Sequence, residues 1–315
     1  MNLSEVHARR QPGRKPVGMA AVLLPFDENG DIAEEAYVSC LKDTIKAGLT
    51  PAVNMDTGYV NLLTDSEKAR VLQIVKDALG DSGTPFVAGA FIEDQDGDVV
   101  DLYRREIAQI ASHGGTPILF QTSRLHNLPA AEVVDAYDRA TRDVPTAYAF
   151  ELGKMFAPNG EIWSSEVFEG ILGIEQIKGA KHSSLDRVIE LERLETKDRL
   201  RPEFSVFTGN DLGIDMIEYG SDYLLGLAAF SPEKFAERDR LWAAQDPAYF
   251  MVADALQLLG NIAFRPQVPA YKHSAATFLN ILGKIPTNKT HPRSPERPVW
   301  EKEILSDCAR RLLLI

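Results

Sequence analysis

The sequence is poor in cysteine, in long apolar runs and in basic charge, and each shortage excludes a class of protein. Its two cysteines, Cys40 and Cys308, lie far apart with no Cys-x-x-Cys spacing, which excludes a disulfide framework and a zinc ribbon. No apolar stretch reaches the roughly 18 to 20 residues of a membrane-spanning helix. Because 46 Asp and Glu outnumber 34 Lys and Arg, for a net charge of −12, neither nucleic acid nor an anionic membrane is expected as a partner. We therefore expect a cytoplasmic protein.

The sequence also lacks the short motifs that hold nucleotides, phosphates or metal ions. It contains no G-x-G-x-x-G after a strand, no P-loop and no H-E-x-x-H. Two acidic segments, 27–31 and 94–98, superficially resemble calcium loops. Neither has both the glycine and the later glutamate that such a loop requires, so turns are expected there. We therefore expect neither a cofactor nor a metal ion.

Short apolar runs alternate with amphipathic segments along most of the chain. With 44% hydrophobic and 25% charged residues, this is the composition of an ordinary globular protein. The apolar runs predict strands over 17–25, 50–55, 85–91, 116–121, 145–151, 174–180, 203–208 and 222–228. Helical spacing occurs in 34–46, 66–79, 99–112, 130–142, 185–195 and 232–244, and then in 247–260, 268–282 and 296–314.

Eight apolar strands with helices between them predict a parallel sheet covered by helices. An open doubly wound sheet is the competing fold. Eight repeats over about 230 residues favour instead the closed (β/α)8 barrel, or TIM barrel, of the α/β class. We therefore expect a flexible basic leader over 1–16, a barrel over 17–245 and a C-terminal helical extension over 246–315.

A lysine at the end of the sixth predicted strand is the first candidate for chemistry. The carboxyl ends of the strands form the active face of such barrels, and Lys181 lies there. An apolar barrel mouth deprives an ammonium group of hydration, which favours the neutral, nucleophilic amine. Such an amine attacks a carbonyl and forms a Schiff base, whose iminium nitrogen accepts electrons during C–C cleavage or formation. The alternative is a lysine that reaches solvent or pairs with a carboxylate.

Five segments in order along the chain resemble the dihydrodipicolinate synthase / N-acetylneuraminate lyase family. They are Pro25-Phe26-Asp27-Glu28-Asn29-Gly30-Asp31-Ile32, Leu63-Thr64-Asp65-Ser66-Glu67-Lys68, Gly179-Ala180-Lys181-His182-Ser183-Ser184, Thr208-Gly209-Asn210-Asp211 and the stretch from Lys272 to Gly283. The third resembles the family's Gly-Ile-Lys-x-x-Ser strand, whose lysine forms the Schiff base. The resemblance implies the same role for Lys181 and a small carbonyl compound as partner. It also implies a homotetramer or a dimer.

The family's second-strand loop, Gly-Thr-Thr-Gly-Glu, holds the carboxylate of a 2-oxo acid, and it is altered here. The matching stretch is Met55-Asp56-Thr57-Gly58-Tyr59. The resemblance implies that Thr57 and Gly58 still bind substrate oxygen, with Asp56 as a further contact. A second carboxylate at about 4 Å from Asp56 costs on the order of 4 kcal/mol at an effective dielectric near 20. The other interpretation of Asp56 is a strand-end residue that caps its own loop.

The family's fifth strand ends in Tyr-Asn-x-Pro, whose tyrosine relays protons, and this motif is incomplete here. Tyr148 is the only tyrosine in the corresponding strand, and no Asn-x-Pro follows it. Because side chains alternate along a strand, a shift of one residue would turn Tyr148 towards the helices. Glu151 is an alternative general acid or base if burial raises its pKa. Pairing of Glu151 with Lys154 is the structural alternative.

Three further residues complete the expected site. After the fourth strand the family has Pro-Tyr-Tyr, whereas this chain has Gln-Thr-Ser-Arg-Leu-His, so Arg124 is the candidate there for a substrate carboxylate. By the resemblance, Gly209 and Leu225 contact the substrate from the ends of strands seven and eight. Because the loop tyrosine of the family's proton relay is missing, we do not predict the dihydrodipicolinate synthase reaction for this protein.

The prediction is a lyase that forms a Schiff base through Lys181 with a 2-oxo acid or a keto-sugar-like compound and catalyses aldol cleavage or condensation. The acidic Asp56 and Glu151 favour a hydroxyl-rich substrate. The alternatives are a Schiff-base dehydratase of the same family and a barrel that binds a carbonyl compound without catalysis. A metal-dependent aldolase that uses Asp56, Glu93 and Asp94 is the weakest, since no histidine stands at a suitable strand end.

Overall fold

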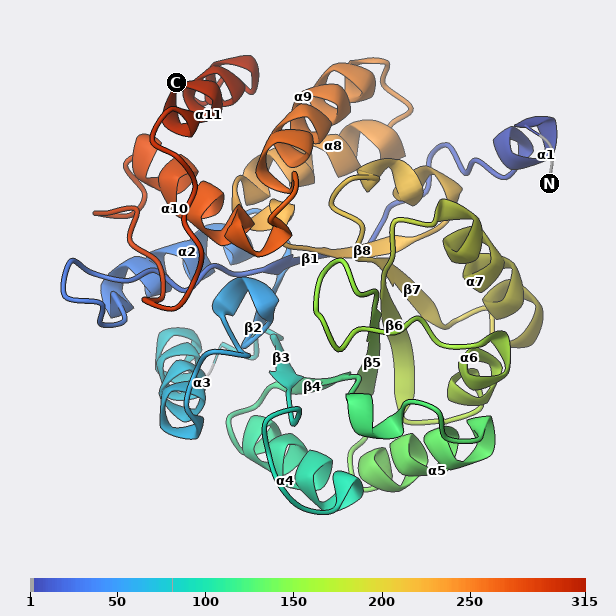
Figure 1. The fold of residues 1–315 in the computed structure, drawn as a ribbon. Coiled ribbons are helices and arrows are strands. Elements are labelled where there is room, and N and C mark those ends of the chain that lie inside the picture. Colours follow the sequence, from blue (N-terminus) through green and yellow to red (C-terminus); the bar gives the residue numbers. More distant parts are fainter. Residues whose placement is uncertain (1–2, 81) are drawn as a thin grey trace. The chain divides into compact units, whose positions relative to one another are not determined.

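The eight predicted strands are all present and form a closed parallel barrel in the computed structural model, which describes residues 3–80 and 82–315. They follow one another around the barrel in chain order. Their bounds are β1 Gly18–Ala21, β2 Thr50–Val53, β3 Val87–Ala90, β4 Thr116–Phe120, β5 Ala147–Leu152, β6 Ile177–Ser183, β7 Ser205–Thr208 and β8 Asp222–Leu225, labelled in Figure 1. The (β/α)8 prediction is confirmed.

Helices follow the strands as the amphipathic segments predict. Their bounds are α1 Leu3–Ala8, α2 Glu34–Lys46, α3 Asp65–Leu79, α4 Val99–Ser112, α5 Ala130–Thr141, α6 Ser165–Leu172, α7 Arg187–Leu200, α8 Pro232–Ala243, α9 Ala248–Ala263, α10 Tyr271–Ile281 and α11 Glu301–Arg311. The short helices α1 and α6 were not predicted, because eight residues or fewer hold too little of a 3.6-residue period.

Local capping explains where α3 begins. The hydroxyl of Thr64 accepts the backbone N–H of Glu67, and the Glu67 carboxylate accepts the backbone N–H of Thr64 at 2.7 Å. This reciprocal capping box satisfies two donors that the helix itself leaves unpaired. At α8, Pro232 stands at the first helical position, but the Ser231 side chain makes no capping hydrogen bond.

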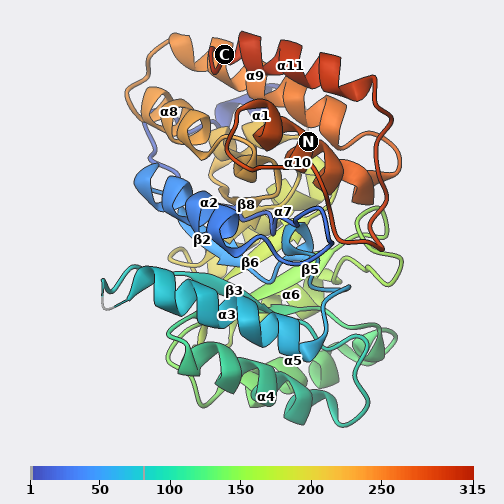
Figure 2. The ribbon, with the colours of Figure 1, turned by 90° about the vertical axis from the view of Figure 1, so that its left-hand side faces the viewer.

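Contacts divide the chain into two units, 50–207 and a unit made of the segments before residue 50 and after residue 207. In the first, β2 to β6 pair in continuous parallel register. In the second, β1 pairs with β8, and α11 packs against both α9 and α10 (Figure 2). The β1–β8 pairing is what joins the N-terminal segment to the chain after residue 207 in this unit.

Ion pairs connect the basic leader to the residues around the start of β8. Arg10 pairs with Glu218 at 2.7 Å, and Arg14 pairs with Asp222 at 2.8 Å. The latter carboxylate also accepts the backbone N–H of Val17 at 2.9 Å. Residues 10–17 are therefore anchored to the segment that leads into β8.

The two acidic loops are turns, as expected. Asp27 accepts the backbone N–H groups of Asn29 and Asp31 with its carboxylate, and Asp98 caps the first turn of α4. Among residues 3–80 and 82–315, no group of three or more His, Cys, Asp or Glu is placed to hold a metal ion. Within the same residues, no helix combines the length and hydropathy needed to cross a membrane.

Candidate active site

Lys181 projects from β6 into the interior of the barrel. Strand β5 lies beside β6 (Figure 1), and their register places Phe150 opposite Lys181 and Glu151 opposite His182. Successive side chains on a strand point to opposite faces, and Glu151 bonds to Arg193 of the outer helix α7. Glu151 and His182 therefore face the helices, whereas Phe150 and Lys181 face inwards. The side chain of Lys181 is buried, with 7% of its surface exposed.

A row of three phenylalanines leads away from the amine of Lys181. Its Nζ lies 4.3 Å from the centroid of the Phe150 ring. That ring packs edge-on against Phe120 of β4, with centroids 4.7 Å apart, and Phe120 packs against Phe91 at 5.6 Å. Phe150 and Phe120 are buried, whereas Phe91, directly after β3, is half-buried. The amine therefore borders a hydrocarbon wall built by three neighbouring strands.

Glu151 is committed to a buried network on the outer face of the barrel wall. Its carboxylate is hydrogen-bonded to Nδ1 of His182 at 2.7 Å. It also accepts hydrogen bonds from Nε of Arg193 at 3.1 Å and from the backbone N–H of Trp163 at 2.7 Å. Burial alone would raise the pKa of Glu151, but the hydrogen bond and charge of His182, with those of Arg193, lower it below the ordinary value. A carboxylate held ionised and facing the helices is poorly placed to donate a proton near Lys181. The partner is Arg193, not Lys154.

Tyr148 lies on the inner face, one layer below the amine. It pairs with Gly179, two residues before Lys181, so it is displaced by about 7 Å along the strand. Its ring meets Phe207 edge-on at 5.4 Å. A Cβ at position 179 would lie 2.7 Å from the ring of Phe207, so the glycine makes room for this layer. The residue directly opposite Lys181 is therefore Phe150, not a tyrosine.

The segment expected to bind a carboxylate forms a tight turn at the end of β2. Asp56–Gly58 is a single 3-10 turn, and Tyr59 closes it in the left-handed conformation with φ 60° and its N–H bonded to the Asp56 carbonyl. A non-glycine residue in that conformation is uncommon and marks a locally strained backbone. Thr57 is buried and Asp56 half-buried. The turn lies at the same end of the barrel wall as the carboxyl end of β6.

Arg124 has a structural role that its sequence position does not reveal. Its guanidinium donates to the carbonyls of Ile92 at 2.9 Å and Gly97 at 3.0 Å, and also to that of Gln95. These three carbonyls belong to the loop between β3 and α4. The side chain expected to bind a substrate carboxylate therefore ties two loops together.

Glu93 also has a structural role. Its carboxylate accepts the hydroxyl of Thr122 at 2.7 Å and the backbone N–H and hydroxyl of Ser123. The carboxylate of Glu93, considered from the sequence as a metal ligand, thus connects the loops after β3 and β4 by hydrogen bonds.

Gly209 and Leu225 belong to the unit that contains β1 and β8. Gly209 directly follows β7, and Leu225 ends β8 opposite Ala20 of β1; both are buried. In the turn after Gly209, the Asp211 carboxylate accepts the backbone N–H of Leu227 at 2.7 Å. That acidic side chain therefore stabilises the connection after β8.

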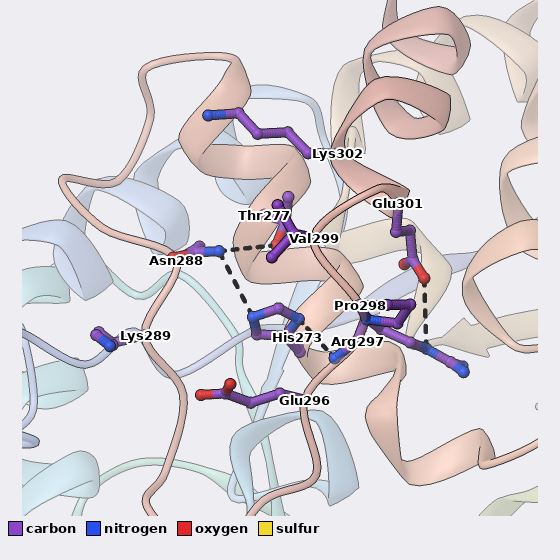
Figure 3. Close-up of a pocket in the computed structure, with 10 residues that line it drawn as sticks. All are labelled: His273, Thr277, Asn288, Lys289, Glu296, Arg297, Pro298, Val299, Glu301 and Lys302. Carbon is purple, nitrogen blue, oxygen red and sulfur yellow. Dashed lines mark hydrogen bonds and ion pairs between the residues drawn. The ribbon is translucent and has the colours of Figure 1, made fainter.

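A separate cavity of about 180 Å³ lies among the C-terminal helices (Figure 3). His273 of α10 accepts the backbone N–H of Arg297 at 2.9 Å, and Asn288 donates to Thr277 at 3.2 Å. The Arg297 guanidinium donates to the carbonyl of Ala263, the last residue of α9, at 2.8 Å and to those of Arg265 and Pro266 beyond it. These polar groups fasten the segment between α10 and α11, and no residue predicted for catalysis or substrate binding lines the cavity.

Comparison with known proteins agrees with the barrel. No family model matches the sequence, and no curated protein matches it. Among solved structures, YagE from Escherichia coli K12, a prophage protein of the dihydrodipicolinic acid synthase family solved with pyruvate, matches 95% of this chain and 99% of its own. The TM-score is 0.82 at 14% identity. This chain has the dihydrodipicolinate synthase fold.

Two more matches extend this likeness to both branches of the resemblance. The dihydrodipicolinate synthase of Thermotoga maritima gives a TM-score of 0.80 at 16% identity, covering 96% of this chain and all of its own. The N-acetylneuraminate lyase of Mycoplasma synoviae gives 0.74 at 13%, covering 95% of this chain and 99% of its own. The dihydrodipicolinate synthase fold therefore accounts for nearly the whole chain, in agreement with the five sequence motifs.

Proposed function

We propose that this protein is a divergent lyase of the dihydrodipicolinate synthase family, in which Lys181 forms a Schiff base with a 2-oxo acid or a related carbonyl compound. The observation that carries the proposal is a buried amine at the carboxyl end of β6, facing the barrel interior against the Phe150 ring. The structure of YagE with pyruvate, a small 2-oxo acid, supports the same class of substrate.

The proposed reaction is aldol cleavage or its reverse. The amine of Lys181 adds to the carbonyl carbon and water leaves, which gives an iminium ion. In cleavage, the hydroxyl at C4 loses its proton, the C3–C4 bond breaks, and its electron pair flows into the iminium as an enamine while an aldehyde departs. Protonation at C3 and hydrolysis release the 2-oxo acid and regenerate the lysine. The π-face of Phe150 favours the cationic iminium.

Three groups of residues assist in this proposal. The hydroxyl of Thr57 orients the substrate carboxylate, with Asp56 and Gly58 in the same turn; the backbone N–H of Gly58 already donates to the Met55 carbonyl at 2.9 Å. Tyr148, which faces the interior, transfers protons. Glu151 acts through His182 as a positioning residue, because its carboxylate is held on the outer face. Assembly as a dimer or tetramer, implied by the resemblance, stays a prediction.

The test is intact mass after incubation with pyruvate and other 2-oxo acids, followed by borohydride reduction. We expect a reduced adduct in the wild type and none in Lys181→Met. Lys272→Met is the matched control, because Lys272 is also buried and also lies over an aromatic ring, at 5.3 Å from Tyr271. An adduct that survives Lys181→Met, or no adduct with any compound, would overturn the mechanism. An adduct without turnover would favour the non-catalytic binding barrel.

A further inference from the structure

We infer that the site accepts a carbonyl compound carrying an aromatic or otherwise apolar group, and that the row Phe91–Phe120–Phe150 is the surface that selects it. This inference rests on the proposed function, since it requires the substrate to be joined to Lys181. It departs from the hydroxyl-rich substrate that the acidic residues of the sequence suggest.

Contact between the substrate and this row follows from the covalent bond. The imine carbon is bonded directly to Nζ, and Nζ lies 4.3 Å from the centroid of the Phe150 ring. Carbon atoms make their best dispersion contact at about 3.5 to 4 Å. The atoms next to the imine on this side therefore meet an aromatic ring instead of a hydrogen-bonding group.

The row continues from the amine towards solvent. Phe150 and Phe120 are buried, and Phe91, directly after β3, is half-buried, so the row ends at a partly exposed ring. The rings are mutually edge-on, with interplanar angles of 61° and 84°. Edge-to-face packing is the arrangement that aromatic side chains prefer, and it leaves the half-buried ring able to receive a further one. An aromatic substituent on the substrate would continue the same packing.

The charged side chains nearest in sequence to this row are bonded to other partners. Glu151 follows Phe150 but faces the helices, where it bonds to His182 and Arg193. Glu93, two residues after Phe91, bonds to Thr122 and Ser123. A sugar-like chain lying along the row would lose its hydrogen bonds to water without gaining partners from these carboxylates, which disfavours it.

The experiment compares three substrates with the same 2-oxo acid end. They are pyruvate, 4-hydroxy-2-oxo-4-phenylbutanoate and a 3-deoxy-2-keto sugar acid, each assayed by borohydride trapping and, for the last two, by the rate of pyruvate release. Even one methylene in a hydrophobic pocket changes kcat/KM by about 10- to 200-fold. We therefore expect kcat/KM for the phenyl compound to exceed that for the sugar acid by at least about tenfold.

Variants of Phe91 test which surface provides the preference. Because Phe91 is half-buried, Phe91→Ser is expected to fold, which circular dichroism and thermal unfolding check, and to lose most of the phenyl preference, whereas Phe91→Leu keeps much of it. Phe250→Ser, at a phenylalanine with 52% exposure in the other unit, is the control and leaves the preference unchanged.

The outcomes separate the two proposals. A wild type that traps pyruvate but favours the sugar acid, or treats both larger compounds alike, overturns this inference and leaves the Schiff-base lyase standing. An unchanged preference in Phe91→Ser also overturns it. If the wild type traps none of the three compounds, the lyase proposal fails and this inference fails with it.

Discussion

Nδ1 of His182 lies 2.7 Å from the carboxylate of Glu151, on the face of the barrel wall opposite to Lys181. Each member of this pair is the chain neighbour of a site residue, because His182 follows Lys181 and Glu151 follows Phe150. The pair therefore holds the β5–β6 register outside the barrel, and the same register sets the amine against its aromatic ring inside. The Glu151–His182 pair therefore contributes both to the stability of the protein and to the geometry of the site.

Glu151→Gln should destabilise the protein by about 3 kcal/mol at pH 7, because it leaves the buried Arg193 without its countercharge. The pKa of Glu151 is lowered in the folded state. Its stabilising contribution is thus complete above the ordinary value near about 4.3 and is lost as the pH falls through the lowered pKa. The difference in unfolding free energy between wild type and variant should shrink below about pH 4.

Denaturant unfolding at pH 7 and in acid measures this effect. Glu169→Gln is the control, since Glu169 forms an exposed pair with Arg199 at 2.9 Å, and such pairs contribute about 1 kcal/mol or less. The buried role of Glu151 would be contradicted if Glu151→Gln lost as little unfolding free energy at pH 7 as the control. It would also be contradicted if this loss did not change in acid.

Arg124→Gln should lower stability and leave substrate affinity unchanged. The guanidinium donates to three backbone carbonyls of the β3–α4 loop. At about 1 kcal/mol for each hydrogen bond, the loss is roughly 2 to 3 kcal/mol. Thermal unfolding and the KM for the preferred substrate are measured together, with the exposed Arg139→Gln as control. A KM raised about tenfold at unchanged stability would instead make Arg124 a carboxylate-binding residue.

Thr57→Val should reduce kcat/KM by about ten- to a hundredfold, the value of one hydrogen bond to a charged group. Thr57→Ser keeps the hydroxyl and should stay close to the wild type. Both variants should still give the borohydride adduct, since the amine is intact. Equal activity of the valine and serine variants would show that the hydroxyl does not bind the substrate.

Tyr148→Phe should lower kcat by about a hundredfold or more, the usual size of a general acid–base contribution. Adduct formation at long times should persist, because the amine and the Phe150 wall are unchanged. Tyr37→Phe, at a fully buried tyrosine of α2 in the other unit, controls for loss of a phenol in general. If Tyr148→Phe turns over like the wild type, the proton is transferred elsewhere.

His273 should make stability fall with decreasing pH. Burial lowers the pKa of His273 against the opposing charges of Glu296 and Glu301, and the nearby Arg297 and Lys289 lower it further. The unfolded chain therefore binds more protons below about pH 6.5, so stability falls as the pH is lowered. His273→Gln should flatten the dependence of Tm on pH between 7.5 and 5, by roughly a few degrees. His7→Gln, at an exposed histidine, should not flatten this dependence. If Tm depends on pH equally in the wild type and both variants, His273 is not the group responsible.

The barrel could be predicted from local sequence patterns alone. Apolar runs at a regular spacing located all eight strands, and helix bounds such as Glu34–Lys46 and Val99–Ser112 agree to the residue. Hydrophobic period and capping act locally, so they can be read without the fold. The position of Lys181 near the end of β6 follows from the same pattern, although the strand continues to Ser183.

Which strand side chains face the interior became clear from the folded chain. Both faces of a parallel barrel strand are buried, so the sequence carries no clear alternation to show which face is which. The register irregularity between Ala147 and Tyr148 adds to this uncertainty in β5. Glu151, a candidate catalytic acid, pairs with Arg193, which lies 42 residues later in the chain, and its side chain therefore faces the outer helices. The same pairing placed Phe150 opposite the lysine, because neighbouring residues on a strand point to opposite sides.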